Sequence, residues 1–246
     1  MTREMAEATV DNTRAARQEA AVLASDARQF PRAAEQWNAL RIDFPDEALY
    51  WRKAGEAYCE MGMFDRADEI VEAALAAFPE DLWIAHRHTV VAQRRADWVE
   101  ALRRADSVWQ RFPDHAIGYV LRGEVLREMG RLDEADAAFA AAVEHFPEDE
   151  WARRGYAELA SRRRAWTEAL ERWQAVRERF PHLVRAQSGL AEALAELNRP
   201  DEAEAAVAEV ILREPDNAEA RAIRPTLARH RSPREVVVQR IRERGI

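Results

Sequence analysis

The chain has 246 residues, of which 48% are hydrophobic and 33% are charged, a composition typical of a folded globular protein and not of a disordered one. Its formal net charge of −8 disfavours nucleic acid as a partner, because proteins that bind phosphate backbones usually present a basic face. A single cysteine, Cys59, excludes an internal disulfide.

The sequence carries no signal for membrane insertion. No stretch approaches the ~18 consecutive apolar residues of a membrane span, and residues 1–20 lack the apolar run of a signal peptide. Together with the lone cysteine, these features predict a cytoplasmic protein. Lys53 is the only lysine, while arginine and alanine are abundant, a bias typical of GC-rich bacterial genomes.

Residues 1–13 form an N-terminal extension that is polar and rich in alanine, and the sequence leaves open whether it is a short helix or a frayed end. Two helices are expected next, near 14–28 and 32–43, with a break at Phe30-Pro31 between them. Pro31 suits the first turn of the second helix, where its missing N–H is not needed.

From there the chain is periodic. Phe-Pro dipeptides recur every 34 residues, at 44–45, 78–79, 112–113, 146–147 and 180–181, and Pro215 stands at the next step. A fixed period of this size predicts stacked units of two helices each. The clearest unit is residues 116–149, which read as a helix, a tight turn at Gly130, a second helix and a stop at Pro147.

Two rows of residues repeat with the same period. One row is always small: Ala33, Ala67, Ala101, Ala135, Ala169 and Ala203. Because two helices can approach closely only where side chains are small, we expect these alanines to be buried where the helices of a pair cross. The other row marks the turn after each first helix: Gly62, Ala96, Gly130, Arg164 and Asn198. Asp65 is the expected N-cap of the helix that follows the first of these turns.

The unit at 48–81 carries the full pattern, with Trp51, Gly55, Tyr58, Gly62, Phe64, Ala67 and Pro79 in phase. The unit at 116–149 has Tyr119, Gly123, Gly130, Leu132, Ala135 and Pro147 at the matching places. In these positions the chain resembles the tetratricopeptide repeat family, with six repeats over residues 14–217. The resemblance implies an all-α fold, a right-handed superhelical solenoid of antiparallel helix pairs whose first helices line a concave groove.

Beyond Pro215 the period fails, and residues 218–246 are expected to form C-terminal capping helices. Ser232 to Glu235 read as a capping box with Pro233 at the first helical position. A last helix near 233–244 is expected to follow. The sequence leaves open whether it caps the solenoid or docks onto a partner or a second subunit, so the oligomeric state also stays open.

The motifs of catalysis and metal binding are missing from the sequence. We find no Gly-rich phosphate loop, no G-x-S-x-G, no H-E-x-x-H and no paired CxxC. His86 and His88 are two residues apart on a helix and so point to different faces. Cys59 lacks a histidine partner and is expected to be a small groove-side residue. We therefore expect no enzyme activity, no metal and no cofactor.

In this family the groove side chains come from one stripe of each first helix. The resemblance places in that stripe Gln18, Val22, Arg52, Glu56, Glu60, Trp83, His86, Val90, Arg94, Val120, Glu124, Arg127, Glu128, Trp151, Arg154, Glu158, Arg162, Arg185, Ser188, Glu192 and Glu196. Glu56, Glu124, Glu158 and Glu192 form a spaced acidic row. The Lys, Asn and Arg of the carboxylate clamp found in chaperone-binding members are replaced here, which disfavours a chaperone tail as ligand.

These features favour a non-catalytic scaffold or adaptor that binds a protein or peptide in the groove. Mixed charge with Trp83 and Trp151 suits an extended or helical segment with alternating basic and apolar residues. The alternative is a module that recruits substrates for a separate enzyme, such as a bacterial glycosyltransferase or sulfotransferase. The sequence identifies neither the partner nor the pathway.

Overall fold

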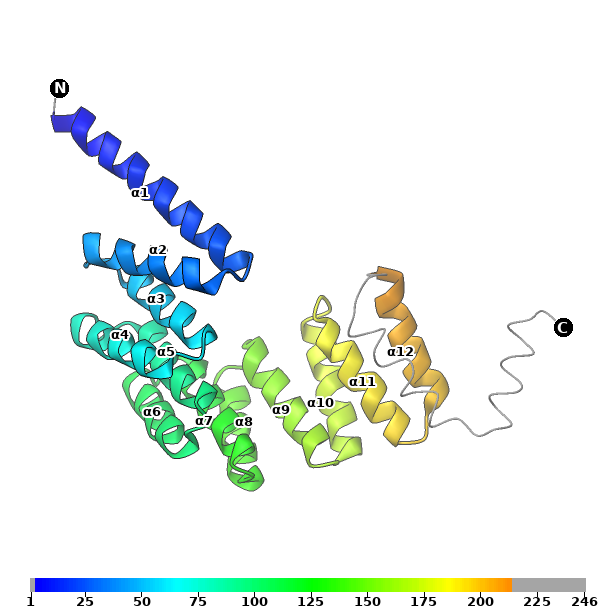
Figure 1. Cartoon of the computed structure of the whole chain (residues 1–246). Helices are drawn as coiled ribbons and strands as arrows, with labels where there is room; N and C mark the ends of the chain where they lie inside the picture. Colours follow the sequence, from blue (N-terminus) through cyan, green and yellow to red (C-terminus); the bar gives the residue numbers. More distant parts are fainter. Residues whose placement is uncertain (1–2, 214–246) are drawn as a thin grey trace. The chain divides into compact units, whose positions relative to one another are not determined.

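The computed structural model describes the backbone of residues 3–213 and the side chains of residues 13–212, and this part contains twelve α-helices and no strand (Figure 1). The all-α fold expected from the sequence is thus confirmed. The chain divides into two compact units, which we call unit 1, ending at Met129, and unit 2, beginning at Gly130.

Each repeat contributes two helices of 13 or 14 residues, apart from a longer first helix. In unit 1 the helices are α1 (Arg3–Asp26), α2 (Phe30–Asp43), α3 (Ala48–Glu60), α4 (Phe64–Ala77), α5 (Leu82–Arg94), α6 (Trp98–Arg111) and α7 (Ala116–Glu128). In unit 2 they are α8 (Leu132–His145), α9 (Glu150–Arg162), α10 (Trp166–Arg179), α11 (Val184–Glu196) and α12 (Pro200–Arg213). Within each unit, helices that follow one another in the chain pack side by side.

The turn after each first helix has a left-handed residue at the predicted place. The φ angles are 72° at Gly62, 61° at Ala96, 75° at Gly130, 57° at Arg164 and 59° at Asn198, and Arg28, which the sequence did not reveal as a turn residue, has 55°. At Gly62 the N–H of Met63 donates to the oxygen of Tyr58 at 3.0 Å, which ties the reversed chain to the end of α3.

Several helix boundaries differ from the expected ones. α1 is a single helix over Arg3–Asp26, so most of the expected extension at 1–13 and the expected helix near 14–28 are continuous. α2 begins at Phe30, with Pro31 in its first turn as expected. Asp65 is not an N-cap: Met63 holds that place, and Asp65 lies in the first turn of α4. The expected helices of residues 218–246 lie outside the described residues.

The alanine row is fully buried. Ala33, Ala67, Ala101, Ala135, Ala169 and Ala203 are all 0% exposed, as the close crossing of two helices requires. The tryptophans are not uniformly buried. Trp37 and Trp173 are buried, whereas Trp51, Trp98, Trp109 and Trp166 are only partly buried.

A buried arginine links three helices of unit 1. Arg104 of α6 is 7% exposed and donates to both carboxylate oxygens of Asp68 in α4, at 2.6 and 3.3 Å. It also contacts Glu100 at 2.7 Å and the backbone oxygen of His88 in α5 at 2.8 Å. Since a charge this buried is stable only when it is paired, the network fixes the register of α4, α5 and α6.

The same network occurs in unit 2, two repeats further along the chain. Arg172 of α10 bonds to Asp136 of α8 at 3.1 Å, to Glu168 and to the backbone oxygen of Tyr156 in α9 at 2.9 Å. Its guanidinium carbon lies 3.2 Å from the centroid of the Tyr156 ring. The two units therefore share their charged core and differ at one neighbour, which is His88 in unit 1 and Tyr156 in unit 2.

Candidate functional site

The stripe expected from the sequence lies on the first helices of the repeats, and we call the part in each unit its first-helix face. In unit 1 the candidate residues are Arg52, Glu56 and Glu60 on α3, Trp83, His86, Val90 and Arg94 on α5, and Val120, Glu124, Arg127 and Glu128 on α7. In unit 2 they are Trp151, Arg154, Glu158 and Arg162 on α9, and Arg185, Ser188, Glu192 and Glu196 on α11.

Three of the expected groove residues are buried. Val120 is 5% exposed and Ser188 is 2% exposed, so neither offers a surface to a partner. Cys59 is also buried, in a cluster with Ala67 and Val91, and burial raises the pKa of its thiol. These side chains belong to the packing between helices, which the stripe pattern alone did not distinguish from the exposed surface.

The centre of the unit 1 face is an arginine stacked on an exposed tryptophan. The guanidinium carbon of Arg52 in α3 lies 5.9 Å from the ring centroid of Trp83 in α5, within the range of a cation–π contact. Trp83 nevertheless remains 53% exposed. Its ring meets the ring of His86 edge to face, with 5.9 Å between the centroids.

His86 lies partly buried beside two arginines. Burial, together with the neighbouring charges of Arg87 and Arg52, lowers the pKa of His86 to about 4, while Glu56 acts in the opposite direction. The imidazole is therefore neutral near pH 7, because burial disfavours its charged form and protonation would add a third positive charge to the pair of guanidinium groups.

The carboxylates that α3 contributes to the unit 1 face are already paired within the chain. Glu56 contacts both Lys53 and Arg87 at 3.1 Å, and Glu60 contacts Arg94 of the next first helix at 3.1 Å. Arg52, in contrast, has no carboxylate partner among the residues that the structure describes. On α3 and α5, the four basic side chains of Arg52, Lys53, Arg87 and Arg94 therefore stand against the two acidic ones of Glu56 and Glu60.

A second arginine of this face is incompletely hydrogen-bonded. The Nε of Arg87 is buried and has no hydrogen-bond partner among the described residues, although the same guanidinium reaches Glu56 through another nitrogen. Arg52 therefore retains the capacity to bind an oxygen acceptor at the surface, whereas the unsatisfied nitrogen of Arg87 is enclosed.

Unit 2 carries the equivalent tryptophan in a different setting. Trp151 is 57% exposed, and the guanidinium carbon of Arg154, on the same helix, lies 4.1 Å from its ring centroid. Arg154 also approaches Glu158 at 3.8 Å, and Glu158 accepts from Arg185 of α11 at 3.2 Å. The arginine next to the exposed ring therefore has a carboxylate nearby here, although its buried Nε, like that of Arg87, has no hydrogen-bond partner among the described residues.

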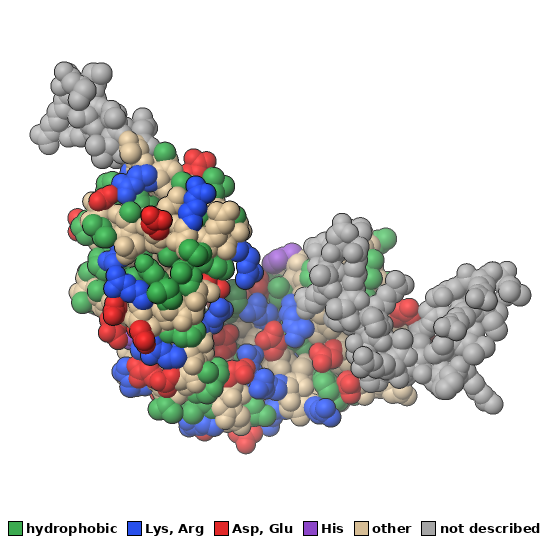
Figure 2. Space-filling view, in the orientation of Figure 1, with side chains coloured by type: hydrophobic (Ala, Val, Ile, Leu, Met, Phe, Trp, Pro, Cys, Tyr) green, Lys and Arg blue, Asp and Glu red, His purple; other side chains and the backbone are tan. Residues whose placement is uncertain are grey.

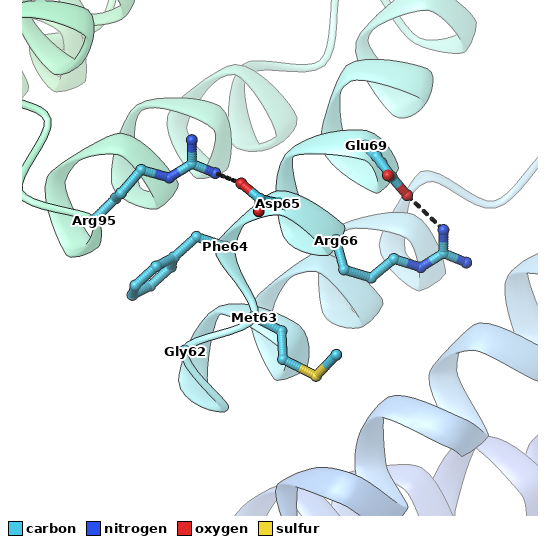
Figure 3. A pocket seen from close by; sticks show the side chains of 7 residues that line it. All are labelled: Gly62, Met63, Phe64, Asp65, Arg66, Glu69 and Arg95. Carbon is cyan, nitrogen blue, oxygen red and sulfur yellow. Dashed lines mark hydrogen bonds and ion pairs between the residues drawn. The ribbon is translucent and has the colours of Figure 1, made fainter.

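The visible surface carries acidic and basic side chains interspersed with apolar ones, as the sequence predicts (Figure 2). A hollow lies at the turn between α3 and α4 and is lined by Gly62, Met63, Phe64, Asp65, Arg66, Glu69 and Arg95. Its charges pair with one another: Arg95 donates to Asp65 at 2.8 Å and Arg66 to Glu69 at 2.6 Å (Figure 3). This pairing leaves the hollow without a charge directed at a ligand.

Within the described residues, no group of three or more His, Cys, Asp or Glu side chains is placed to share a metal ion. Over the same part of the chain, no helix has the length and apolar character needed to cross a membrane.

The fold and the face define a repeat protein of stacked helix pairs. Models of the tetratricopeptide repeat match residues 19–81, 117–159 and 162–224, which together span more than half of the chain. The chain therefore belongs to the tetratricopeptide repeat family, whose fold is that of a protein–protein interaction scaffold.

Solved structures show the same fold. A tetratricopeptide repeat protein from Parabacteroides merdae has 16% identity and a TM-score of 0.63, covering 88% of this chain and 86% of that one. PilW, a type IV pilus biogenesis factor, has 16% identity and a TM-score of 0.66, covering 86% and 98%. YrrB, described as having an unusual peptide-binding site, has 18% identity and a TM-score of 0.52, covering 78% and 100%. A search of curated proteins found no match.

Proposed function

We propose that the protein is a non-catalytic scaffold that binds a segment of a protein partner on its first-helix faces. The observation that carries the proposal is the pair of tryptophans, Trp83 and Trp151, which stand at equivalent positions and are each more than half exposed. A large apolar ring held in water is costly, whereas tryptophan and arginine are the side chains that contribute most to binding at protein interfaces.

The surroundings of both rings support a peptide ligand. Each ring is held by an arginine, so it is pre-oriented and loses little side-chain freedom on binding. The backbone of both faces is regular helix, which gives a rigid platform for an extended or helical segment. The peptide-binding site named for YrrB is consistent with such a ligand, although the similarity to YrrB is one of fold.

The test is a comparison of two double variants of the full chain. Trp83→Ala with Trp151→Ala removes both rings, and we expect a partner captured from the native cell to bind at least about tenfold more weakly to this variant. Isothermal titration calorimetry with the purified partner measures the change. Circular dichroism checks that the helix content is kept.

Ile42→Ala with Val99→Ala is the matched control. These side chains are 62% and 75% exposed and lie on the second helices α2 and α6, so the control also removes two exposed apolar groups. We expect unchanged binding. Loss of binding in the control but not in the tryptophan variant would place the partner on the second helices and refute the proposal.

A further inference from the structure

We propose that the α3–α5 surface of unit 1, formed by Arg52, Trp83, His86 and Arg87, binds a protein segment in which an apolar or aromatic side chain lies within a few residues of a carboxylate. This inference rests on the proposed function and adds the chemistry of the partner. The partner segment proposed here is acidic, whereas the sequence alone favoured a segment with alternating basic and apolar residues.

The first step of the argument is the charge that remains after internal pairing. Glu56 is held between Lys53 and Arg87, so the carboxylate expected to attract a basic partner is already neutralised twice. The Arg52 guanidinium has no carboxylate partner among the described residues. Because like charges repel at close range, a lysine or arginine of a partner is disfavoured at this place, and an aspartate or glutamate is favoured.

The second step is the hydrogen-bonding capacity of the two arginines. The buried Nε of Arg87 lacks an acceptor, and a buried donor without an acceptor costs about 1–3 kcal/mol. That nitrogen is enclosed, so it adds to the positive charge of the site and is not itself a contact for a ligand. A carboxylate that approaches the Arg52 guanidinium forms charge-assisted hydrogen bonds, which are the stronger kind.

The third step is the position of the apolar surface. Trp83 lies under Arg52 and beside His86, so one exposed ring borders the positive centre directly. A partner residue that stacks on Trp83 places its chain neighbours within reach of the two guanidinium groups. An apolar residue and a carboxylate close together in sequence satisfy both requirements at once, and the neutral His86 ring adds no competing charge.

The experiment uses the full chain and immobilised nine-residue peptides on a Gly/Ser background. Each peptide contains one apolar or aromatic residue and one charged residue, with the identity and spacing of both varied. We expect the protein to retain peptides with Asp or Glu within about three residues of Trp, Phe or Leu. Replacing Asp by Asn in a retained peptide should weaken binding at least about fivefold, measured by fluorescence anisotropy.

Variants of Arg52 locate the bound peptide. Arg52→Gln should weaken the acidic peptide about fivefold to tenfold and reduce the salt dependence of binding, and Arg52→Lys should have an intermediate effect because it keeps the charge and loses the planar stacking. Arg66→Gln is the matched control, with the same change of charge on α4, where Arg66 already pairs with Glu69. In the NMR spectrum of the wild type, the His86 imidazole signals should shift on binding.

Selection of peptides with Lys or Arg, or no selection at all, would overturn the inference. Neither result touches the proposed function, which is judged independently by the tryptophan variants and a captured partner. Equal weakening by Arg52→Gln and Arg66→Gln would also overturn it, because the effect would then follow the net charge of the protein and not this surface.

Discussion

Unit 1 and unit 2 place an arginine at the same position of a first helix, Arg52 and Arg154, and the two arginines differ in their carboxylate contacts. Arg52 crosses to the tryptophan of the next first helix and has no carboxylate partner among the described residues. Arg154 stacks on the tryptophan of its own helix and approaches Glu158. Equivalent positions in a repeat therefore do not imply equivalent recognition.

One difference between the units, the position from which the next first helix reaches this glutamate, has a cause in the core beneath the face: Glu158 is reached from Arg185 and not from the position of Arg87. In unit 1 the carboxylate of Glu56 is bound by Arg87 of the next first helix. The position equivalent to Arg87 beside Glu158 is Gly189, which has no side chain to offer. A Cβ at Gly189 would lie 2.2 Å from Cε2 of Trp173, so the large ring in the core excludes a basic residue above it. The corresponding core residue in unit 1 is Val71, which is smaller.

The largest effect is therefore expected at Gly189. Gly189→Ala drives a methyl group into the Trp173 ring and should destabilise unit 2 by about 3 kcal/mol, the upper range for overpacking. Adding Trp173→Val, which reproduces the core of unit 1, should give a double variant less destabilised than the sum of the two single changes. Urea unfolding measures stability, and additive effects would show that Trp173 does not exclude a side chain at position 189.

The second expected effect concerns the neighbour of the buried arginines, His88 in unit 1 and Tyr156 in unit 2. Burial, together with the charge of Arg104, lowers the pKa of His88 to about 4. Between the ordinary histidine pKa of about 6.5 and pH 4, the unfolded chain binds a proton that the folded protein excludes. Stability is thus complete above pH 6.5 and is lost as the pH falls towards 4.

His88→Tyr copies unit 2 and should remove about 2 kcal/mol of this acid-induced loss. His86 has a similarly lowered pKa and contributes to the loss of stability in acid in both proteins. The measurement is therefore the free energy of unfolding of the variant and of the wild type, each at pH 7 and at pH 4.5. His182→Tyr is the control, because His182 is 73% exposed. An unchanged slope of stability against pH in His88→Tyr would mean that His88 is protonated in the folded protein.

The sequence predicted the periodic features of the fold because each depends on residues within one repeat. The alanine row and the left-handed turns follow from local size and backbone geometry, which recur every 34 residues. The state of the candidate site depends on pairs between repeats. Glu56 looks like Glu158 in the sequence, and only the structure shows that Glu56 pairs with Lys53 and Arg87, whereas Glu158 pairs with Arg154 and Arg185. The burial of Val120 likewise depends on its neighbours and not on its place in the stripe.

The smallest effects are expected at the left-handed turn residues, which both units have. Ala96 in unit 1 and Arg164 in unit 2 have φ angles of 61° and 57°, which strain a residue with a Cβ and do not strain glycine. Ala96→Gly and Arg164→Gly should each stabilise the protein by about 0.5–1 kcal/mol. Gly62→Ala should cost a similar amount, and because a Cβ there meets nothing within 4 Å, its cost is one of backbone conformation alone. Hydrogen exchange followed by mass spectrometry assigns each change to its unit. If the turns act independently of the core, the gains in the two units will be equal, whereas a gain confined to one unit would show that the difference between the units extends to their turns.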